Sequence, residues 1–142
     1  MNVGSWQFWA LLSATFAALT AIFAKIGVEN VNADVATFLR TLVIVAVLAG
    51  ILLATGEFRT PGDLSLRSGI FLVLSGLATG ASWLCYFRAL QLGDASRVAP
   101  IDKLSVVLVA LIGATFLGER LSPANWAGVA LIAAGAILVG MR

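Results

Sequence analysis

The sequence contains no histidine, a single cysteine and few charged side chains. Histidine is the commonest metal ligand and the commonest general base, so its absence removes most metal sites and most acid–base active sites. The lone Cys85 cannot form an internal disulfide bond, and its place inside an apolar run is typical of a small buried residue. No serine–lysine pair or paired carboxylates are evident either. We therefore expect no metal site, no cofactor and no enzymatic activity.

Charge is also scarce, at 11% of residues, while hydrophobic residues make up 61% of the chain. Ordinary soluble chains have roughly 25% charged and 45–50% apolar residues. A soluble fold of this size must cover itself with charge, and these side chains are too few to do so. The net charge is only +2, which gives no indication of a nucleic-acid partner. The composition predicts an integral membrane protein whose surroundings are the lipid bilayer.

Charged residues divide the chain into long uncharged runs. The runs 1–24, 68–87 and 121–141 each match the ~20 residues that a helix needs to cross the hydrocarbon core. Two shorter runs become long enough when they extend N-terminally through Arg40 and through Asp102 and Lys103. The chain is therefore predicted to be a single all-α membrane domain over residues 1–142. Its five transmembrane helices are expected at about 5–27, 34–55, 66–91, 97–118 and 123–141.

Ionisable side chains gather toward one side of this arrangement. We call the membrane side of the N-terminus side one and the opposite side two. Five groups from four helices lie at or inside side two: Lys25, Arg40, Arg88, Asp102 and Lys103. An ionisable residue inside a bilayer is a functional candidate by default, so we expect these groups to bind or couple a substrate. The alternative is that long stems reach the interface and pair with loop acids.

Asp102 and Lys103 are adjacent, so on a regular helix their side chains point about 100° apart. One of them is expected to face the bundle interior while the other pairs with a neighbouring helix. An unpaired buried charge is far more costly than a pair. Asp102 is therefore predicted to pair with Arg40, Lys25 or Lys103 of another helix or subunit.

The third helix carries a polar and aromatic stripe, formed by Ser75, Thr79, Ser82, Trp83 and Tyr86. These residues share one helical face. The stripe is expected to border a wet cavity, where Trp83 and Tyr86 contact a substrate and Thr79 and Ser82 supply hydrogen bonds. The alternative is hydrogen bonding between helices together with an interfacial aromatic belt.

Several short motifs follow one another in a fixed order. Residues 86–96 read YFRALQLGDAS, residues 98–100 read VAP and residues 117–122 read LGERLS. Residues 126–135, WAGVALIAAG, end the series. The chain resembles the EamA module of the drug/metabolite transporter superfamily over nearly its whole length. The usual member has two modules and ten helices, so this chain resembles half of one and the short, five-helix branch.

The resemblance implies a secondary transporter in a bacterial inner membrane, often an exporter of small metabolites or toxic compounds. In related four-helix exporters an acid in the first helix couples protons to transport. Here the first helix has no acid, so carboxylate-based proton coupling would fall on Asp102. The alternative function is a non-transporting half-subunit that needs a different five-helix partner.

An odd number of helices places the two termini on opposite membrane sides, so a second module fused to the first would be inverted. Inverted repeats build the midplane sites of many transporters. Orientation is set largely by Lys and Arg in short loops, and here the two sides are nearly balanced. Without the deeper Arg40 and Lys103, side one has Arg59, Arg67 and Arg120, and side two has Lys25, Arg88, Arg97 and Arg142; with them, side two has six. We expect an antiparallel homodimer binding a small-molecule substrate between its subunits, with a parallel dimer as the alternative.

Overall fold

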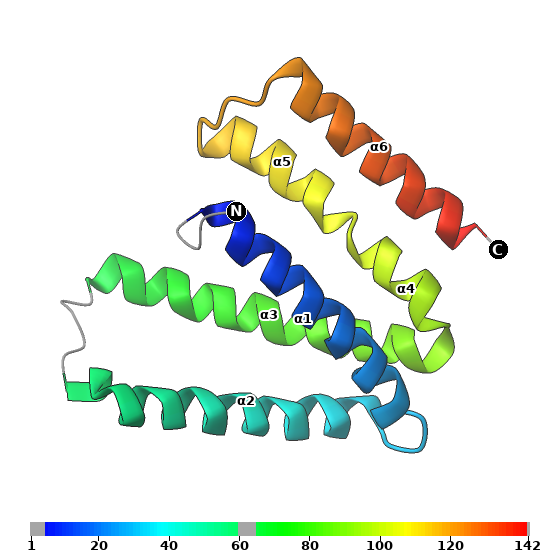
Figure 1. The fold of residues 1–142 in the computed structure, drawn as a ribbon. Coiled ribbons are helices and arrows are strands. Elements are labelled where there is room, and N and C mark those ends of the chain that lie inside the picture. The colour runs from blue at the N-terminus through cyan, green and yellow to red at the C-terminus, as the bar shows by residue number, and fades with distance from the viewer. Residues whose placement is uncertain (1–4, 60–64, 142) are drawn as a thin grey trace. The chain divides into compact units, whose positions relative to one another are not determined.

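The computed structural model describes residues 5–59 and 65–141. Helices dominate this part of the chain, and it contains no strand (Figure 1). The elements are α1 (Trp6–Gly27), α2 (Ala33–Thr55), the 3₁₀ turn η1 (Glu57–Arg59), α3 (Leu66–Leu92), α4 (Ala95–Asp102), α5 (Ser105–Phe116) and α6 (Pro123–Gly140).

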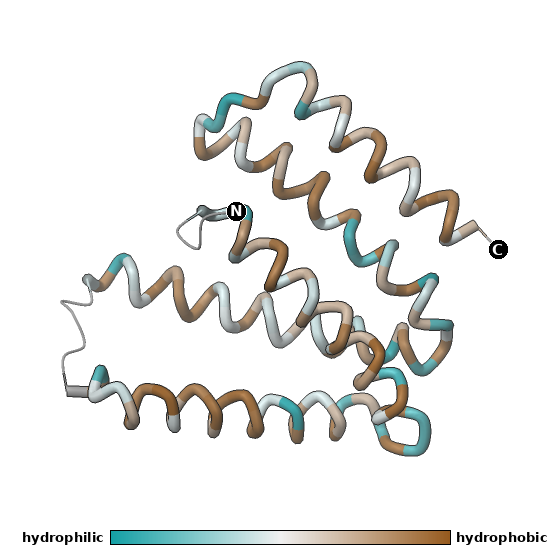
Figure 2. The backbone as a smooth tube through the Cα atoms, in the orientation of Figure 1, coloured by the Kyte–Doolittle hydropathy of each residue, from teal (hydrophilic) through white to brown (hydrophobic). Residues whose placement is uncertain are grey.

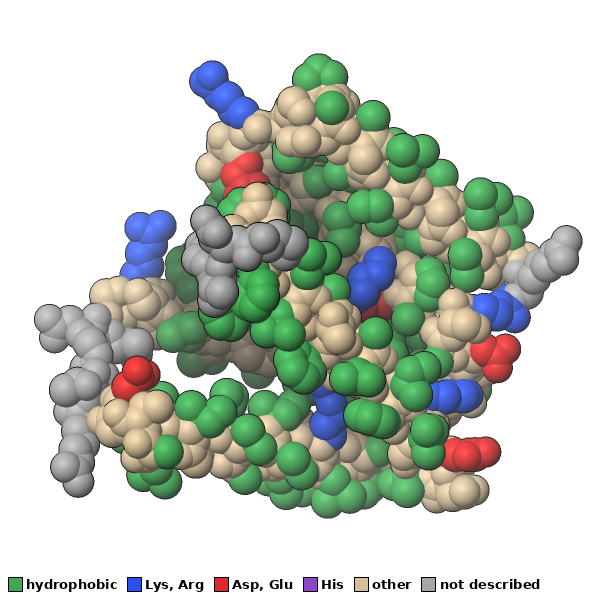
Figure 3. Space-filling model, in the orientation of Figure 1, with side chains coloured by type: hydrophobic (Ala, Val, Ile, Leu, Met, Phe, Trp, Pro, Cys, Tyr) green, Lys and Arg blue, Asp and Glu red, His purple; other side chains and the backbone are tan. Residues whose placement is uncertain are grey.

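Five segments of the described residues are long and apolar enough to cross a membrane: α1, α2, α3, α6, and α4 together with α5 over Ala95–Phe116. The all-helical, five-span fold predicted from the uncharged runs is thereby confirmed. Long hydrophobic stretches of the helices are separated by short hydrophilic ones (Figure 2). Apolar side chains are spread over the visible surface (Figure 3), and many large ones are exposed while few are buried. Such a surface suits lipid, because hydrocarbon does not expel apolar side chains as water does.

Local signals in the sequence fix several helix ends. The Asn32 side chain accepts hydrogen bonds from the backbone N–H groups of Asp34 and Val35 at the start of α2. Ser122 accepts one from the Asn125 N–H at the start of α6, where Pro123 is the first helical residue. These caps satisfy N–H groups that have no partner inside a helix.

Residues 26–91 form one of two compact units, which contains α2 and α3 as an antiparallel pair (Figure 1). Two side chains of α3 reach the N-terminal end of α2 and the loop before it. Arg88 pairs with Asp34, and Gln91 Nε2 donates to the backbone oxygens of Val28 at 3.2 Å and Val31 at 2.6 Å. These contacts join α2 and α3 at one end.

Residues 1–25 and 92–142 form the other unit, in which α4 and α5 both pack along α6. Lys25 Nζ, in the last turn of α1, donates to the Gly93 backbone oxygen at 3.0 Å. Arg97 Nη2 donates to the Gly140 oxygen at 3.4 Å, at the end of α6. Cationic side chains at helix C-termini are favourable because the exposed carbonyl groups there carry partial negative charge.

The fourth span differs from the continuous helix expected over 97–118. It is broken into α4 and α5, with Lys103 and Leu104 in a turn between them. The Lys103 N–H bonds to both Ala99 O and Pro100 O, and the Leu104 N–H bonds to Ile101 O. The bonds to Pro100 O and Ile101 O reach only the third residue back, as in a 3₁₀ turn, while the bond to Ala99 O is still α-helical. Pro100, inside α4, already deprives this stretch of one backbone donor.

Gly118, just after α5, has a φ of +69°. Because that conformation costs an L-residue about 1–2 kcal/mol, Gly118→Ala is expected to lower stability in detergent by about 1 kcal/mol. Gly50→Ala is the control, since Gly50 lies within α2 with nothing within 4 Å of an added Cβ. Denaturation with SDS measures both. Equal stability of the two variants would mean that the turn after α5 does not depend on glycine.

Candidate functional site

Arg40 lies two turns into α2, about 10 Å from its first residue. Its guanidinium carbon Cζ is 3.7 Å from the centroid of the Trp83 ring and 5.5 Å from that of Phe87. Trp83 and Phe87 are one turn apart on α3 and so share a face. Tyr86 of the same helix lies close enough to interact electrostatically with Arg40. The guanidinium is therefore held against an aromatic face of α3.

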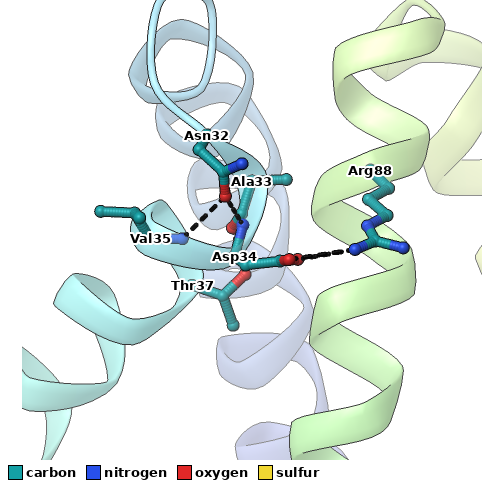
Figure 4. Close-up of polar contacts among 6 residues, drawn as sticks. All are labelled: Asn32, Ala33, Asp34, Val35, Thr37 and Arg88. Atoms are coloured by element: carbon teal, nitrogen blue, oxygen red, sulfur yellow. Dashed lines mark hydrogen bonds and ion pairs between the residues drawn. The ribbon is translucent and has the colours of Figure 1, made fainter.

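The neighbouring cation, Arg88, has a carboxylate partner. Its Nη2 lies 3.0 Å from Asp34 Oδ2 and 3.3 Å from Oδ1 (Figure 4). Asp34 stands in the first turn of α2, next to the Asn32 cap. The two side chains are 65% and 48% exposed, and such an open pair contributes only about 0–1 kcal/mol in water. The interpretation that Arg88 pairs with a loop-side acid matches this contact.

Arg40 forms no ion pair within the described residues, whose two pairs are Arg88–Asp34 and Lys103–Asp102. A cation over an aromatic ring gains about 0.5–2 kcal/mol. An arginine at the centre of a helix in the membrane costs at least about 2.5–3.5 kcal/mol. The aromatic contact therefore offsets only part of the cost of the charge, which makes Arg40 the strongest candidate among the predicted site residues.

Asp102 and Lys103 lie in the other unit, where α4 ends. Lys103 Nζ is 3.1 Å from Asp102 Oδ2. The sequence predicted that these side chains diverge and that Asp102 pairs with another helix or subunit. Within this chain Asp102 instead pairs with the next residue, because the long, flexible lysine stem can reach back to the neighbouring carboxylate. A pairing with a second subunit stays a prediction.

The remaining predicted site residues make other contacts or are exposed. Lys25 donates to Gly93 O. The Thr79 hydroxyl donates to the Ser75 oxygen of its own helix at 2.8 Å, and Ser82 is exposed. A wet cavity along the α3 stripe stays a prediction. Phe87 was missed from the sequence, although its place one turn after Trp83 could have indicated it.

A double-mutant cycle measures the contact between Arg40 and Trp83. The single variants Arg40→Gln and Trp83→Leu and their combination are expected to give a coupling of about 1 kcal/mol in unfolding free energy. Trp126→Leu replaces Trp83→Leu in the control cycle, because Trp126 is on α6 in the other unit. A coupling no larger than that of the control would show that the guanidinium does not rest on Trp83 in solution.

Comparison with known proteins points to the class that the sequence predicted, a membrane transporter. An "uncharacterized transporter in cobO 3'region" from Sinorhizobium sp is 64% identical over 137 residues, covering 96% of this chain and 97% of its relative. The "uncharacterized transporter YxxF" of Bacillus subtilis (strain 168) is 29% identical over 141 residues, and this chain spans only 44% of its length. No solved structure matches.

The model of the EamA-like transporter family matches residues 4–141, nearly the whole chain. The resemblance seen in motifs such as residues 86–96 is thereby confirmed, and the five apolar spans fit a multi-pass protein. The relatives are likewise named as transporters. The chain belongs to the EamA-like transporter family of membrane proteins.

Proposed function

We propose that this chain is a secondary transporter that exports a small metabolite or toxic compound across the inner membrane. It works as an antiparallel homodimer by alternating access. Family membership supports transport, and the observation that carries the proposal is the interrupted fourth span. Transporters commonly hold substrate or coupling ions where a membrane helix is broken near the midplane.

The break lies at Lys103–Leu104, about 12 Å from the start of α4. Lys103 and Leu104 keep right-handed helical backbone angles, but their N–H groups bond to the third residue back, and such a 3₁₀ stretch within a helix often marks a functional hinge. Asp102 stands directly before the break and is the deepest carboxylate in the described spans. It is therefore the group to which we assign proton coupling.

Dimer formation is supported by the count of spans and by chain length. Five spans put the termini on opposite sides, and this chain covers only 44% of the longer B. subtilis relative. Two copies in opposite orientations would supply the ten helices of a two-module transporter. The small residues Ala124, Gly128 and Gly135 of α6 offer a face for close contact between copies.

Reporter fusions test dual orientation. When the deeper Arg40 and Lys103 are left out, side one has three Lys or Arg residues and side two has four, so the orientation bias is nearly nil. One of the four, Arg142, lies outside the described residues. A reporter at the C-terminus is expected to be active in both compartments. The variant Glu29→Lys/Asn30→Lys adds positive charge to side two and should move the C-terminus to the cytoplasm and lower transport.

The matched control is Glu29→Gln/Asn30→Gln, which changes the same loop without adding positive charge. It should leave the C-terminus in both compartments. A strictly one-sided reporter in the unaltered protein would contradict the antiparallel dimer and favour the parallel one.

Asp102→Asn tests proton coupling. The solute is first found by thermal-shift screening of the purified protein against a metabolite library. Proton movement driven by a gradient of that solute is then followed with an internal pH dye in proteoliposomes. Asp102→Asn is expected to abolish this proton movement or to uncouple it from solute flux, because the amide cannot exchange a proton. Asp94→Asn is the control, since Asp94 precedes α4. Normal coupled transport by Asp102→Asn would remove Asp102 from the mechanism.

The same preparation tests whether one chain suffices. A singly expressed protein should purify as a dimer and move the solute. A monomer without transport, rescued by a different five-helix protein, would instead establish a half-subunit.

A further inference from the structure

The guanidinium of Arg40 has hydrogen-bond donors that the described residues leave unused. We propose that Arg40, resting on Trp83, binds the carboxylate of a small organic anion with an apolar body. This anion would be the substrate class of the transporter, and in that respect the inference rests on the proposed function. Binding can nevertheless be measured without transport.

A guanidinium carbon 3.7 Å from a ring centroid, as Arg40 Cζ is from that of Trp83, is at stacking distance, and a stacked guanidinium contacts the ring with its flat face. The five N–H donors lie in the guanidinium plane and point outward. Those donors form the planar fork that matches a carboxylate in a bidentate pair. The aromatic contact therefore fixes the orientation of the fork and leaves its hydrogen-bonding edge for a ligand.

The described part of Arg40's own unit, residues 26–59 and 65–91, offers this fork no carboxylate. Asp34, at the start of the same helix, is held by Arg88. An unpaired charge at this depth is strongly unfavourable, and the aromatic rings offset only part of that cost. An anion from outside the chain would supply the missing interaction.

Depth favours a dissolved solute over a lipid headgroup. Arg88 and Asp34 meet at the helix ends, whereas Trp83 lies five residues, about 7.5 Å, further along α3 toward the other side. The Arg40 guanidinium rests at this deeper level and is not extended toward the interface as in snorkelling. Trp83, Tyr86 and Phe87 also surround it with aromatic surface, which suits an apolar body attached to the carboxylate.

Fluorescence of Trp83 tests the site directly. The variant Trp6→Phe/Trp9→Phe/Trp126→Phe leaves Trp83 as the sole tryptophan. Acetate, benzoate and phenylacetate are titrated against this protein in neutral maltoside detergent, with benzamide and phenylacetamide as uncharged counterparts. Saturable changes are expected with benzoate and phenylacetate, and none with the amides.

In the same background, Arg40→Gln should weaken binding by about tenfold or more, as expected for the loss of a charged hydrogen-bonding partner. Arg40→Lys keeps the charge without the planar fork and should weaken binding several-fold while preserving the helical circular dichroism spectrum. Arg67→Gln is the control for general attraction of anions, because Arg67 lies in the first turn of α3, at its other end. It should bind as the parent does.

The site is refuted if no carboxylate produces a saturable change, or if Arg40→Gln and Arg40→Lys both bind like the parent. Displacement of benzoate by phosphatidylglycerol through the same Arg40 dependence would make a lipid headgroup the occupant and would also overturn the proposal. Binding without transport of any solute would contradict the proposed function and leave this site intact. Transport of a solute without carboxylate binding would refute this site and leave the proposed function intact.

Discussion

The hydrocarbon core of the bilayer offers no water to a charged or polar group, and this constraint organises the whole chain. Arg88 and Lys103 are paired with carboxylates, and Lys25 donates to a backbone oxygen. Within its own unit, the described side chains against the Arg40 guanidinium are aromatic. The paired cations stabilise helix ends and turns. Arg40 is only partly stabilised by its neighbours, so a ligand would gain the most binding free energy there.

Two departures from a simple helical bundle stand out, one in each compact unit. The first is the break between α4 and α5 beside Asp102, and the second is the guanidinium held over Trp83. The first places a 3₁₀-type turn and a titratable carboxylate inside a span. The second places an oriented cation there. Under the proposed function, coupling and substrate binding would then depend on different elements.

The five spans could be predicted because uncharged runs of about 20 residues have few other uses. The order of motifs from residue 86 onward also indicated the family. The break at Lys103–Leu104 could not be placed, because Pro100 signals a disturbed helix without fixing where its hydrogen bonds rearrange. The contact of Arg40 with Trp83 and Phe87 was likewise missed, because the direction of a long side chain depends on its neighbours in space and not on sequence spacing.

The antiparallel assembly is tested most directly by the mass of two tandem fusions, measured by light scattering in detergent. A direct fusion of two copies inverts the second copy, because each has five spans. A fusion through one added transmembrane helix keeps both copies parallel. The direct fusion should be a monodisperse single polypeptide, because its two copies form the dimer interface with each other. The fusion through an added helix should associate into larger species. The antiparallel dimer would be contradicted if the parallel fusion stayed a single polypeptide while the direct fusion associated into larger species.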